Sequence, residues 1–436
     1  MTVRYTTELV TDARAFAEVA PDWGRLYERC ATATPFQNHA WLHSWWLSYG
    51  RPGRLRLVLV REGAELVAAA PLMLRRAPVP TLVPLGGPIS DYGDVLIDGE
   101  RADRAATALA EALSAAARTA LIDFREVRPG GAAEHVYDRW SGPRRRMRDS
   151  LCLELPAVPM DELLSRLPSG KAQRTRAKLR KLRSLGVERH VVAPDQVGAA
   201  LSRLLELHRL QWQGRRMTSE HLQTRFCEHL VRSVGPMVRS GDAVVTEFRL
   251  DDDVVAVDLT LLSRGLAGGY LYGAHPRLRE RKADVAVMLL DACAQHTGIG
   301  GLGTLSLLRG NESYKHHWRP EPVSNQRLLL ARRRTAPLMS AVVGDVAARR
   351  RGKELLRRFR ERIGDGGPVS GPTVTGDRYP VRDHLSRRKH TFRPSQDSNQ
   401  SLKRTGEQVV GRNGAGGAVG TGSGAGSPVP PERADR

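Results

Sequence analysis

Cysteine is scarce in this chain. The four cysteines, Cys30, Cys152, Cys227 and Cys293, lie far apart and form no C-x-x-C pair, which argues against a zinc site and against the disulfide framework of small secreted domains. Long apolar runs are also missing, because no stretch reaches the roughly 20 residues that span a bilayer. The N-terminal segment MTVRYTTELVTDARAF lacks the continuous apolar core of a signal peptide. We therefore expect a protein of the reducing cytoplasm.

Acidic residues are too few to balance the basic ones. The chain has 68 Lys and Arg against 47 Asp and Glu, which gives a formal charge of +21 and a pI near 10.6. Such a surface attracts polyanions, among them nucleic acid, an anionic membrane face and a phosphorylated cofactor. Charge alone does not choose among these partners.

The end of the chain has almost no apolar periodicity. Residues 366–436 are rich in Gly, Ser, Pro and Thr, so we predict a disordered tail. Before it, residues 335–363 have the pattern of one helix with an arginine-rich face, which is either a solvated surface helix or an anion-binding arm. The remainder of the 436 residues, with 41% hydrophobic content overall, is long enough for two domains with real cores.

Two halves of the chain show the same order of predicted elements. The first half contains helices at 12–30 and 38–49, a hairpin formed by RLRLVLV and ELVAAAPLML, strands at 79–86 and 94–98, a helix at 101–118 and a strand at 121–127. The second half contains helices at 195–217 and 219–233, the strands AVVTEFRL, VVAVDLTLL and AGGYLYGA, a helix at 284–297 and a strand at 303–308. This repetition predicts an α/β fold that duplicates one unit.

Several segments resemble one family of acyltransferases. They are PFQNHAWLHSWW, AAAPLML and GGPISDYGDVL in the first half, and SGKAQRTRAKLRKLRSLG, LHRLQWQGRR and LLRGNESYKHHW in the second. Together they resemble the GNAT-superfamily acyltransferases of the CelD and BioF type over residues 30–330. This family is similar to the Fem aminoacyltransferases, which also pair two GNAT-like halves.

The resemblance implies a domain organisation. We expect two tandem GNAT-like domains at 1–155 and 156–334, each a mixed and mostly antiparallel sheet flanked by helices, with catalysis in the second. A basic helix at 335–365 and the tail at 366–436 follow.

The resemblance also implies an activity. An acyl group moves, usually from acyl-CoA, to an amine or hydroxyl by direct attack, and for this chain we expect acetyl as the acyl group and no metal. The acceptor would be a small molecule or a cell-envelope precursor. The relation to Fem proteins leaves aminoacyl-tRNA as an alternative donor, and a basic binding protein of the same fold without turnover is a further alternative.

The donor is expected along the third strand of the second half. Gly268 and Gly269 would let a ligand approach the strand closely, although an ordinary central strand is the alternative. The candidate cofactor-binding residues of this strand are Tyr270, Tyr272 and Gly273.

The diphosphate of CoA would lie at the N-terminus of the next helix, where free N–H groups favour anions. Arg279, Arg281 and Lys282 precede this helix. GNAT proteins carry glycines at this turn, whereas this chain has Lys282 and Asp284. Their side chains would crowd a phosphate, and the carboxylate would repel it. This departure weakens CoA as the donor.

The segment 309–315 gathers a cation, a carboxylate, a phenol and an ammonium behind a strand. Tyr314 would protonate the leaving group, and Glu312 would serve as the base. Arg309 and Lys315 would flank an anionic group of the substrate. A solvated turn with Tyr314 as a packed anchor is the alternative.

Four further residues are candidates. Asp258 lies inside an apolar strand, where a carboxylate needs a partner or a role, so it is a second candidate base or part of a buried ion pair. Asp91 and Tyr92 belong to a predicted cleft loop whose carboxylates are too few to bind a metal. Trp212, in the family's His-x-x-x-Trp pattern, is a substrate-binding candidate, as are Asp91 and Tyr92.

One segment of the second half is strongly basic. Residues 166–183 contain eight Lys and Arg and no acidic residue. It could bind nucleic acid through counterion release. The resemblance instead favours a helix that frames the acyl-donor cleft.

Overall fold

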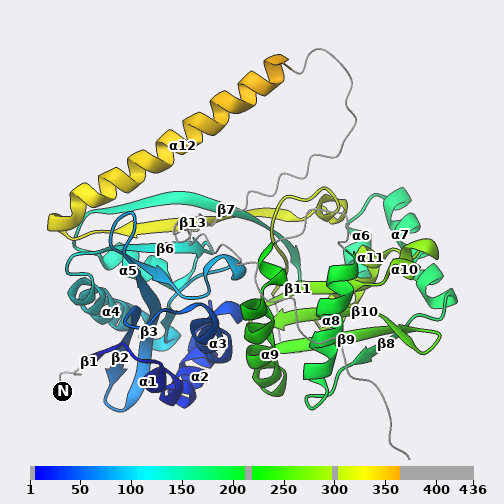
Figure 1. Cartoon of the computed structure of the whole chain (residues 1–436), viewed down its shortest axis with the longest axis horizontal. Helices are drawn as coiled ribbons and strands as arrows, with labels where there is room; N and C mark the ends of the chain where they lie inside the picture. The colour runs from blue at the N-terminus through cyan, green and yellow to red at the C-terminus, as the bar shows by residue number, and fades with distance from the viewer. Residues whose placement is uncertain (1–4, 212–218, 297–302, 364–436) are drawn as a thin grey trace, which may run out of the picture. The chain divides into compact units, whose positions relative to one another are not determined.

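The computed structural model describes residues 5–211, 219–296 and 303–363. Figure 1 shows these residues as ribbons, coloured along the chain. None of the helices in these ranges is long and apolar enough to cross a membrane. The predicted tail at 366–436 lies outside the described residues.

The first half contains both predicted helices of its N-terminal segment and the predicted hairpin. Its strands are β1 (Tyr5–Val10), β2 (Leu55–Glu62), β3 (Glu65–Arg75), β4 (Thr81–Pro84), β5 (Leu96–Ile97), β6 (Leu121–Val127) and β7 (Arg144–Pro156). Its helices are α1 (Ala13–Glu18), α2 (Ala20–Arg29), α3 (His39–Tyr49), α4 (Ala102–Ala116) and α5 (Ala132–Arg139), with short 3-10 turns η1 (Pro35–Gln37), η2 (Gly87–Ile89) and η3 (Gly99–Arg101).

The second half opens with two helices that precede its strands. Its helices are α6 (Met160–Ser165), α7 (Ser169–Ser184), α8 (Val197–Gln211), α9 (Thr224–Arg239), α10 (Pro276–Glu280), α11 (Val285–Gln295) and α12 (Ala336–Ile363), with η4 (Ser219–Leu222), η5 (Lys315–Trp318) and η6 (Arg333–Thr335). Its strands are β8 (Glu188–Val191), β9 (Ala243–Leu250), β10 (Asp253–Leu262), β11 (Leu266–Ala274), β12 (Thr304–Arg309) and β13 (Glu321–Leu330).

The strands of both halves join in one sheet. Among the described residues the sheet has 13 strands in the order β1-β2-β3-β4-β6-β13-β7-β12-β11-β10-β9-β8, and β5 pairs with β3. Most neighbouring pairs are antiparallel, and β4–β6 and β11–β12 are parallel. The fold is therefore the mixed, mostly antiparallel α/β arrangement that the sequence predicts.

The last strand of the chain's second half lies inside the first half's part of the sheet. β13 inserts between β6 and β7, and β7 pairs on its other side with β12 (Figure 1). Arg327 of β13 makes a buried, two-pronged ion pair with Asp123 of β6, at 2.7 and 2.8 Å. This exchange ties the two halves together through backbone ladders and through buried charges.

Two apolar clusters fill the space between the sheet and its helices. One runs through both halves and includes Trp41 of α3 and Leu230 of α9. The other lies between α6, α7 and α11 and the strands of the second half, and it includes Leu182 and Cys293. The strands of the second half are thus covered by α8 and α9 on one face and by α11 on the other.

Candidate active site

The site is built where β11 and β12 separate. The two strands are parallel neighbours only over residues 266–268 and 304–306. On its other side β12 pairs with β7 along its whole length, from Thr304 opposite Pro156 to Arg309 opposite Cys152. A strand that loses its neighbour leaves an edge of backbone N–H and C=O groups to which a ligand can add.

Both separating strands are irregular at the same level. In β11 the register jumps so that Leu259 faces Leu271 while Thr260 faces Gly269, which makes Tyr270 an extra, bulged residue. In β12 the residue Leu308 has a φ of +58°, a left-handed conformation that costs roughly 1–2 kcal/mol outside glycine. A bulge re-aims side chains and backbone groups, and such features are common beside active sites.

Side chains of α8 line the open edge of β11. The His275 N–H donates to the Val255 carbonyl of β10 at 2.8 Å. Because backbone groups alternate in an antiparallel pair, the N–H and C=O groups of Tyr272 and Ala274 point away from β10. Nδ1 of His208 lies 2.7 Å from the Tyr272 carbonyl oxygen. The Ala274 N–H donates to Gln211 at 3.1 Å, and Gln211 in turn donates to the Tyr272 hydroxyl at 3.0 Å.

Gly273 permits this arrangement. A β-carbon at this position would lie 2.4 Å from the carbonyl oxygen of Leu204 and 2.5 Å from the backbone nitrogen of His208. The glycine is therefore required by the close approach of α8 to β11. Gly269, by contrast, borders open space.

The segment after β12 folds into a compact turn. Gly310 has a φ of +119°, and a β-carbon there would lie 2.4 Å from the Glu312 carboxylate. Lys315 donates to the Arg309 carbonyl at 2.9 Å and makes an ion pair with Glu312, also at 2.9 Å. Partial burial, together with Glu312 and Tyr272, raises the pKa of Tyr314, whose side chain is 56% exposed. Glu312, Tyr314 and Tyr272 thus lie in one region.

Arg309 points into the first half of the chain. Its guanidinium contacts Asp91 at 2.5 Å, Glu126 at 3.2 Å and the Pro88 carbonyl at 2.5 Å. The predicted substrate residues Arg309 and Asp91, 218 positions apart, therefore meet and neutralise each other. This pair fastens β12 to the 85–95 loop.

Tyr92 is fully buried in the same loop. Its hydroxyl contacts Ser306 at 2.8 Å and donates to Glu154 at 3.1 Å, and its residue is only 1% exposed. Gly93 donates its N–H to the Glu126 carbonyl of β6 at 3.0 Å. The loop thereby occupies the edge of β6 in the first half, the strand that corresponds to β12.

Asp258 lies on the other face of the sheet from α8. Asp258 is 3% exposed, and its carboxylate accepts a hydrogen bond from the Thr260 hydroxyl at 2.8 Å. Burial raises the pKa of Asp258 to about 7, against the lowering effect of Thr260. Burial raises the pKa of Cys293 in α11, and the nearby charge of Asp258 raises it further.

Trp212, the remaining predicted substrate residue, lies outside the described residues.

The turn before α11 is the place where the sequence predicts the diphosphate of CoA. Arg281, Lys282 and Ala283 donate their N–H groups to carbonyls of α10, at 2.9, 2.9 and 2.8 Å. The Asp284 carboxylate accepts from the Val287 N–H at 3.1 Å and pairs with Lys178 of α7 at 2.7 Å. These four amides are therefore satisfied within the chain, and a carboxylate occupies the helix terminus. These residues do not fit a diphosphate.

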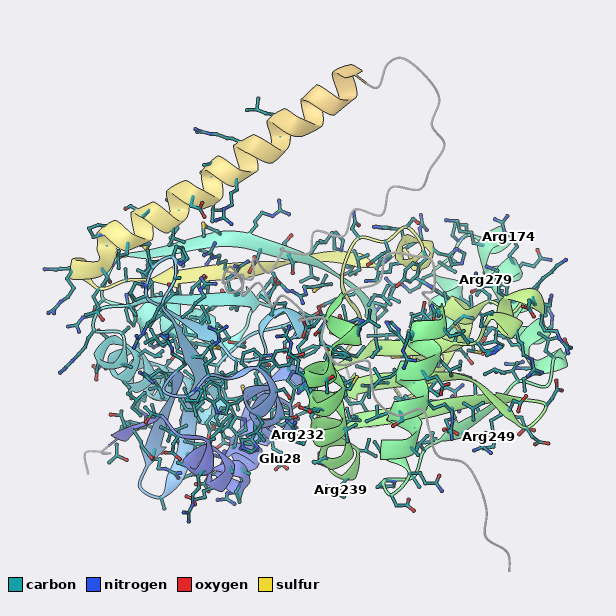
Figure 2. All side chains as sticks on the ribbon, viewed as in Figure 1. Glu28, Arg174, Arg232, Arg239, Arg249 and Arg279 are labelled. Carbon is teal, nitrogen blue, oxygen red and sulfur yellow. The ribbon has the colours of Figure 1, made fainter. Side chains whose placement is uncertain are left out.

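Basic side chains surround this turn. Arg279, Arg281 and Lys282 are exposed, and Figure 2 labels Arg279 and Arg174 on the ribbon near α10 and α7. Of the eight basic residues at 166–183, only Lys178 makes an ion pair among the described residues. Thr175 of α7 meets Nε2 of His317 at 3.1 Å, which connects this helix to the turn after β12.

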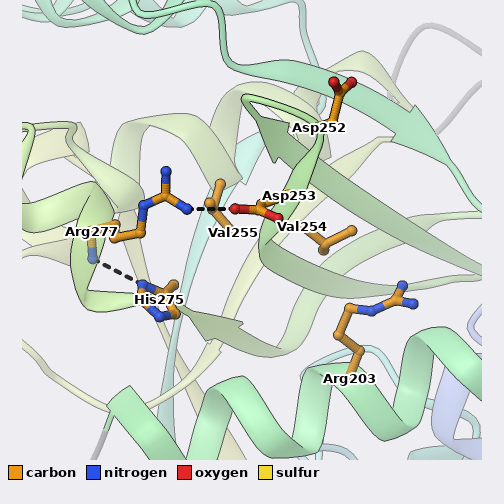
Figure 3. Close-up of a pocket in the computed structure, with 7 residues that line it drawn as sticks. All are labelled: Arg203, Asp252, Asp253, Val254, Val255, His275 and Arg277. Atoms are coloured by element: carbon orange, nitrogen blue, oxygen red, sulfur yellow. Dashed lines mark hydrogen bonds and ion pairs between the residues drawn. The ribbon is translucent and has the colours of Figure 1, made fainter.

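A separate surface hollow lies at the β9–β10 turn (Figure 3). Its lining residues are Arg203, Asp252, Asp253, Val254, Val255, His275 and Arg277. Arg277 pairs with Asp253 at 2.7 Å, and Arg203 pairs with Glu247. The hollow contains none of the predicted site residues, and its cations are already neutralised. Within the described residues, no three His, Cys, Asp or Glu side chains are grouped to hold a metal ion.

Sequence reasoning did not select His208 or Gln211 as site residues. His208 is 7% exposed, and its second nitrogen, Nε2, lies 3.2 Å from Nδ1 of His221 in η4. Polar residues three positions apart on an apolar helix are a weak signal. Only the contact with β11 shows that they lie at the open edge.

Comparisons with known proteins agree with this architecture. Residues 169–316 match the model of the acetyltransferase (GNAT) domain family. The structure of FemX is similar, with a TM-score of 0.52 and 11% identity over 74% of this chain and 96% of that chain. No curated protein matches the chain in sequence.

Two further solved structures are similar at lower TM-scores. One is the C-terminal domain of a protein assigned as a lysylphosphatidylglycerol synthetase from Agrobacterium fabrum, with a TM-score of 0.49 and 15% identity over 75% of this chain and 96% of that chain. The other is L-PGS from Bacillus licheniformis, with a TM-score of 0.46 and 12% identity over 76% and 96%. Residues 169–316, which enclose the separation of β11 and β12, therefore match a GNAT acetyltransferase domain, and the chain shares its fold with FemX.

Proposed function

We propose that this protein transfers an activated acyl group to an amine or hydroxyl of an acceptor, at the open edge of β11. The observation that supports this most is the combination of a bulged strand, an edge without a neighbouring strand and a group of polar side chains beside it. The matched GNAT domain covers the same residues. The activity is that of an N- or O-acyltransferase.

Direct attack needs no covalent enzyme intermediate. The acceptor nitrogen or oxygen attacks the acyl carbon, a C–N or C–O bond forms, and the bond from the acyl carbon to the leaving group breaks. In the proposed mechanism Glu312 takes the acceptor's proton and Tyr314 gives one to the leaving group. The β11 edge aligns the acyl group, and alignment supplies much of the rate enhancement.

The remaining candidate residues have supporting parts in this proposal. Lys315 holds Glu312 in place through its ion pair. Arg309 and Asp91 join the 85–95 loop to β12. Asp258 lies beneath α11 and takes part in neither proton transfer of the proposed mechanism. His208 and Gln211 orient the β11 edge through Tyr272 and Ala274.

We further propose that residues 1–155 and 156–334 act as two domains with different tasks. In the first, the 85–95 loop bonds to the edge of β6 beyond the point where β6 and β4 stop pairing. The second keeps its edge for the reaction. The first domain would then serve as a scaffold that supports β12 through β7.

The donor is the finer question. Acetyl-CoA is the donor that the sequence analysis predicts, and GNAT domains typically use it. The turn before α11 does not fit the diphosphate of acetyl-CoA, so the proposed mechanism contains no step that depends on this diphosphate. Aminoacyl-tRNA is the second candidate, favoured by the basic residues of α7 that have no acidic partner among the described residues. Such a helix would contact phosphates through counterion release.

The test supplies both donors to the purified protein. One reaction contains isotope-labelled acetyl-CoA and the other contains tRNA charged with labelled amino acids, each with a cell extract as the source of acceptors. We expect label in a covalent product with one donor. Tyr314→Phe should reduce incorporation by about 10²-fold or more, whereas the remote Tyr137→Phe should not. Equal incorporation by wild type and Tyr314→Phe, or no incorporation from either donor, would leave the non-catalytic binding protein as the better description.

A further inference from the structure

The N-terminus of α11 is occupied by the chain's own carboxylate. Asp284 caps the helix by accepting from the Val287 N–H at 3.1 Å, and its other oxygen lies 2.7 Å from Nζ of Lys178. A carboxylate that accepts an amide N–H and pairs with a cation satisfies the same groups that a phosphate oxygen would. The Asp284 side chain is 28% exposed and the Lys178 side chain 44%, so the pair lies at the surface that a donor would reach.

Three amides of the preceding turn are engaged as well. α10 ends in a Schellman arrangement, in which Ala283 donates to the Leu278 carbonyl five residues earlier and Lys282 adopts a φ of +54°. Arg281 and Lys282 donate to the Arg277 and Arg279 carbonyls. In a phosphate-binding turn these N–H groups point at the ligand, and glycines let the backbone approach it. Here they stabilise α10, and a lysine occupies the left-handed position.

We infer that Asp284, Lys178 and the turn after α10 together prevent coenzyme A from binding at the N-terminus of α11. The inference rests on the proposed acyl-transfer function and narrows its donor class to acyl groups whose carrier needs no diphosphate at α11. Asp284 determines this specificity in two ways, because its negative charge repels a phosphate and its carboxylate already accepts the Val287 N–H of α11. Lys178 is the cation that would hold a phosphate if Asp284 were removed.

The experiment measures binding rather than transfer. Isothermal titration uses CoA, which carries the diphosphate, and pantetheine, which does not. Wild type should bind CoA no more tightly than pantetheine. The double variant Asp284→Gly with Lys282→Gly should bind CoA at least about tenfold more tightly than wild type, with pantetheine binding unchanged. Adding Lys178→Met to this double variant should remove the gain.

Two controls keep the result interpretable. Asp284→Asn keeps a capping side chain but removes its charge, so it should give a smaller gain than glycine. Asp253→Asn neutralises an acidic residue that pairs with Arg277 at the β9–β10 turn, and it should give none. Thermal unfolding of each variant shows whether it is folded before titration.

The outcomes separate the two proposals. Binding of CoA by wild type at least tenfold tighter than pantetheine overturns the exclusion, as does a folded double variant that gains no affinity for CoA. Failure of acyl transfer with every donor would instead count against the proposed function, and the binding comparison would still stand.

Discussion

His229 offers a sharp test of how α3 packs on α9. Its residue is fully buried, its ring lies 4.4 Å from that of Trp41, and neither ring nitrogen has a hydrogen-bond partner among the described residues. Burial, with a smaller contribution from Arg232, lowers the pKa of His229 to about 3 from the ordinary 6.5. Protonation in the folded state would place an unpaired charge in an apolar core.

The sign of the pH effect follows from proton linkage. Between pH 6.5 and about 3 the unfolded chain binds a proton at His229 that the folded chain refuses. Stability is therefore fully present above pH 6.5 and falls as the pH is lowered. The contribution of this residue is about 2 kcal/mol between pH 7.5 and pH 5, because each pH unit below 6.5 costs about 1.4 kcal/mol.

Urea unfolding at pH 7.5 and pH 5 measures this loss. His229→Phe keeps the aromatic contact with Trp41 and removes the proton-binding group, so its stability should fall by about 2 kcal/mol less than that of wild type over this interval. His39, whose pKa burial lowers to about 4, contributes in both proteins and cancels in the comparison. An identical pH dependence in wild type and His229→Phe would refute the account of a buried, unpartnered imidazole.

Three other substitutions test the site and the strand exchange. Gly273→Ala should destabilise the protein by about 1–3 kcal/mol and lower acyl transfer, because the new β-carbon meets the Leu204 carbonyl; Gly269→Ala, which borders open space, is its matched control in unfolding and transfer assays. Lys282→Gly should raise the unfolding free energy by about 0.5–1 kcal/mol, since its φ is +54°, and a lower denaturation midpoint would contradict this. Asp123→Asn should cost about 3–5 kcal/mol by leaving Arg327 buried without its partner, with thermal unfolding as the readout and the exposed Asp345→Asn as the control.

Much of the fold could be predicted from local pattern. The alternation in RLRLVLV and ELVAAAPLML, around a tight turn, predicts the hairpin that the structure contains as β2 and β3. Helical periodicity predicts α3, α4 and α11 to within a few residues. These elements bury one regular face, so their neighbours in sequence are enough to reveal them.

The strands that join the halves could not be predicted in this way. β7 begins with Arg144-Arg145-Arg146, which has the composition of a solvated loop, yet it pairs with β13 along this stretch. Its partners on this stretch, Leu328 to Leu330, lie more than 180 positions further along the chain. A strand whose pairing is entirely non-local carries little signal in its own sequence.

In the candidate site, too, some features depend on local sequence and others on long-range contacts. The sequence by itself determined the repeated order of helices and strands, the existence of the strand β11 and the lack of glycines before α11, because each depends on residue type at a position along the chain. Only the tertiary structure decided that Arg309 is taken up by Asp91, that His208 and Gln211 lie on the edge of β11, and that Asp284 pairs with Lys178. A charged side chain has the same chemistry whether it meets a substrate or another part of its own chain, and that choice is made by long-range packing.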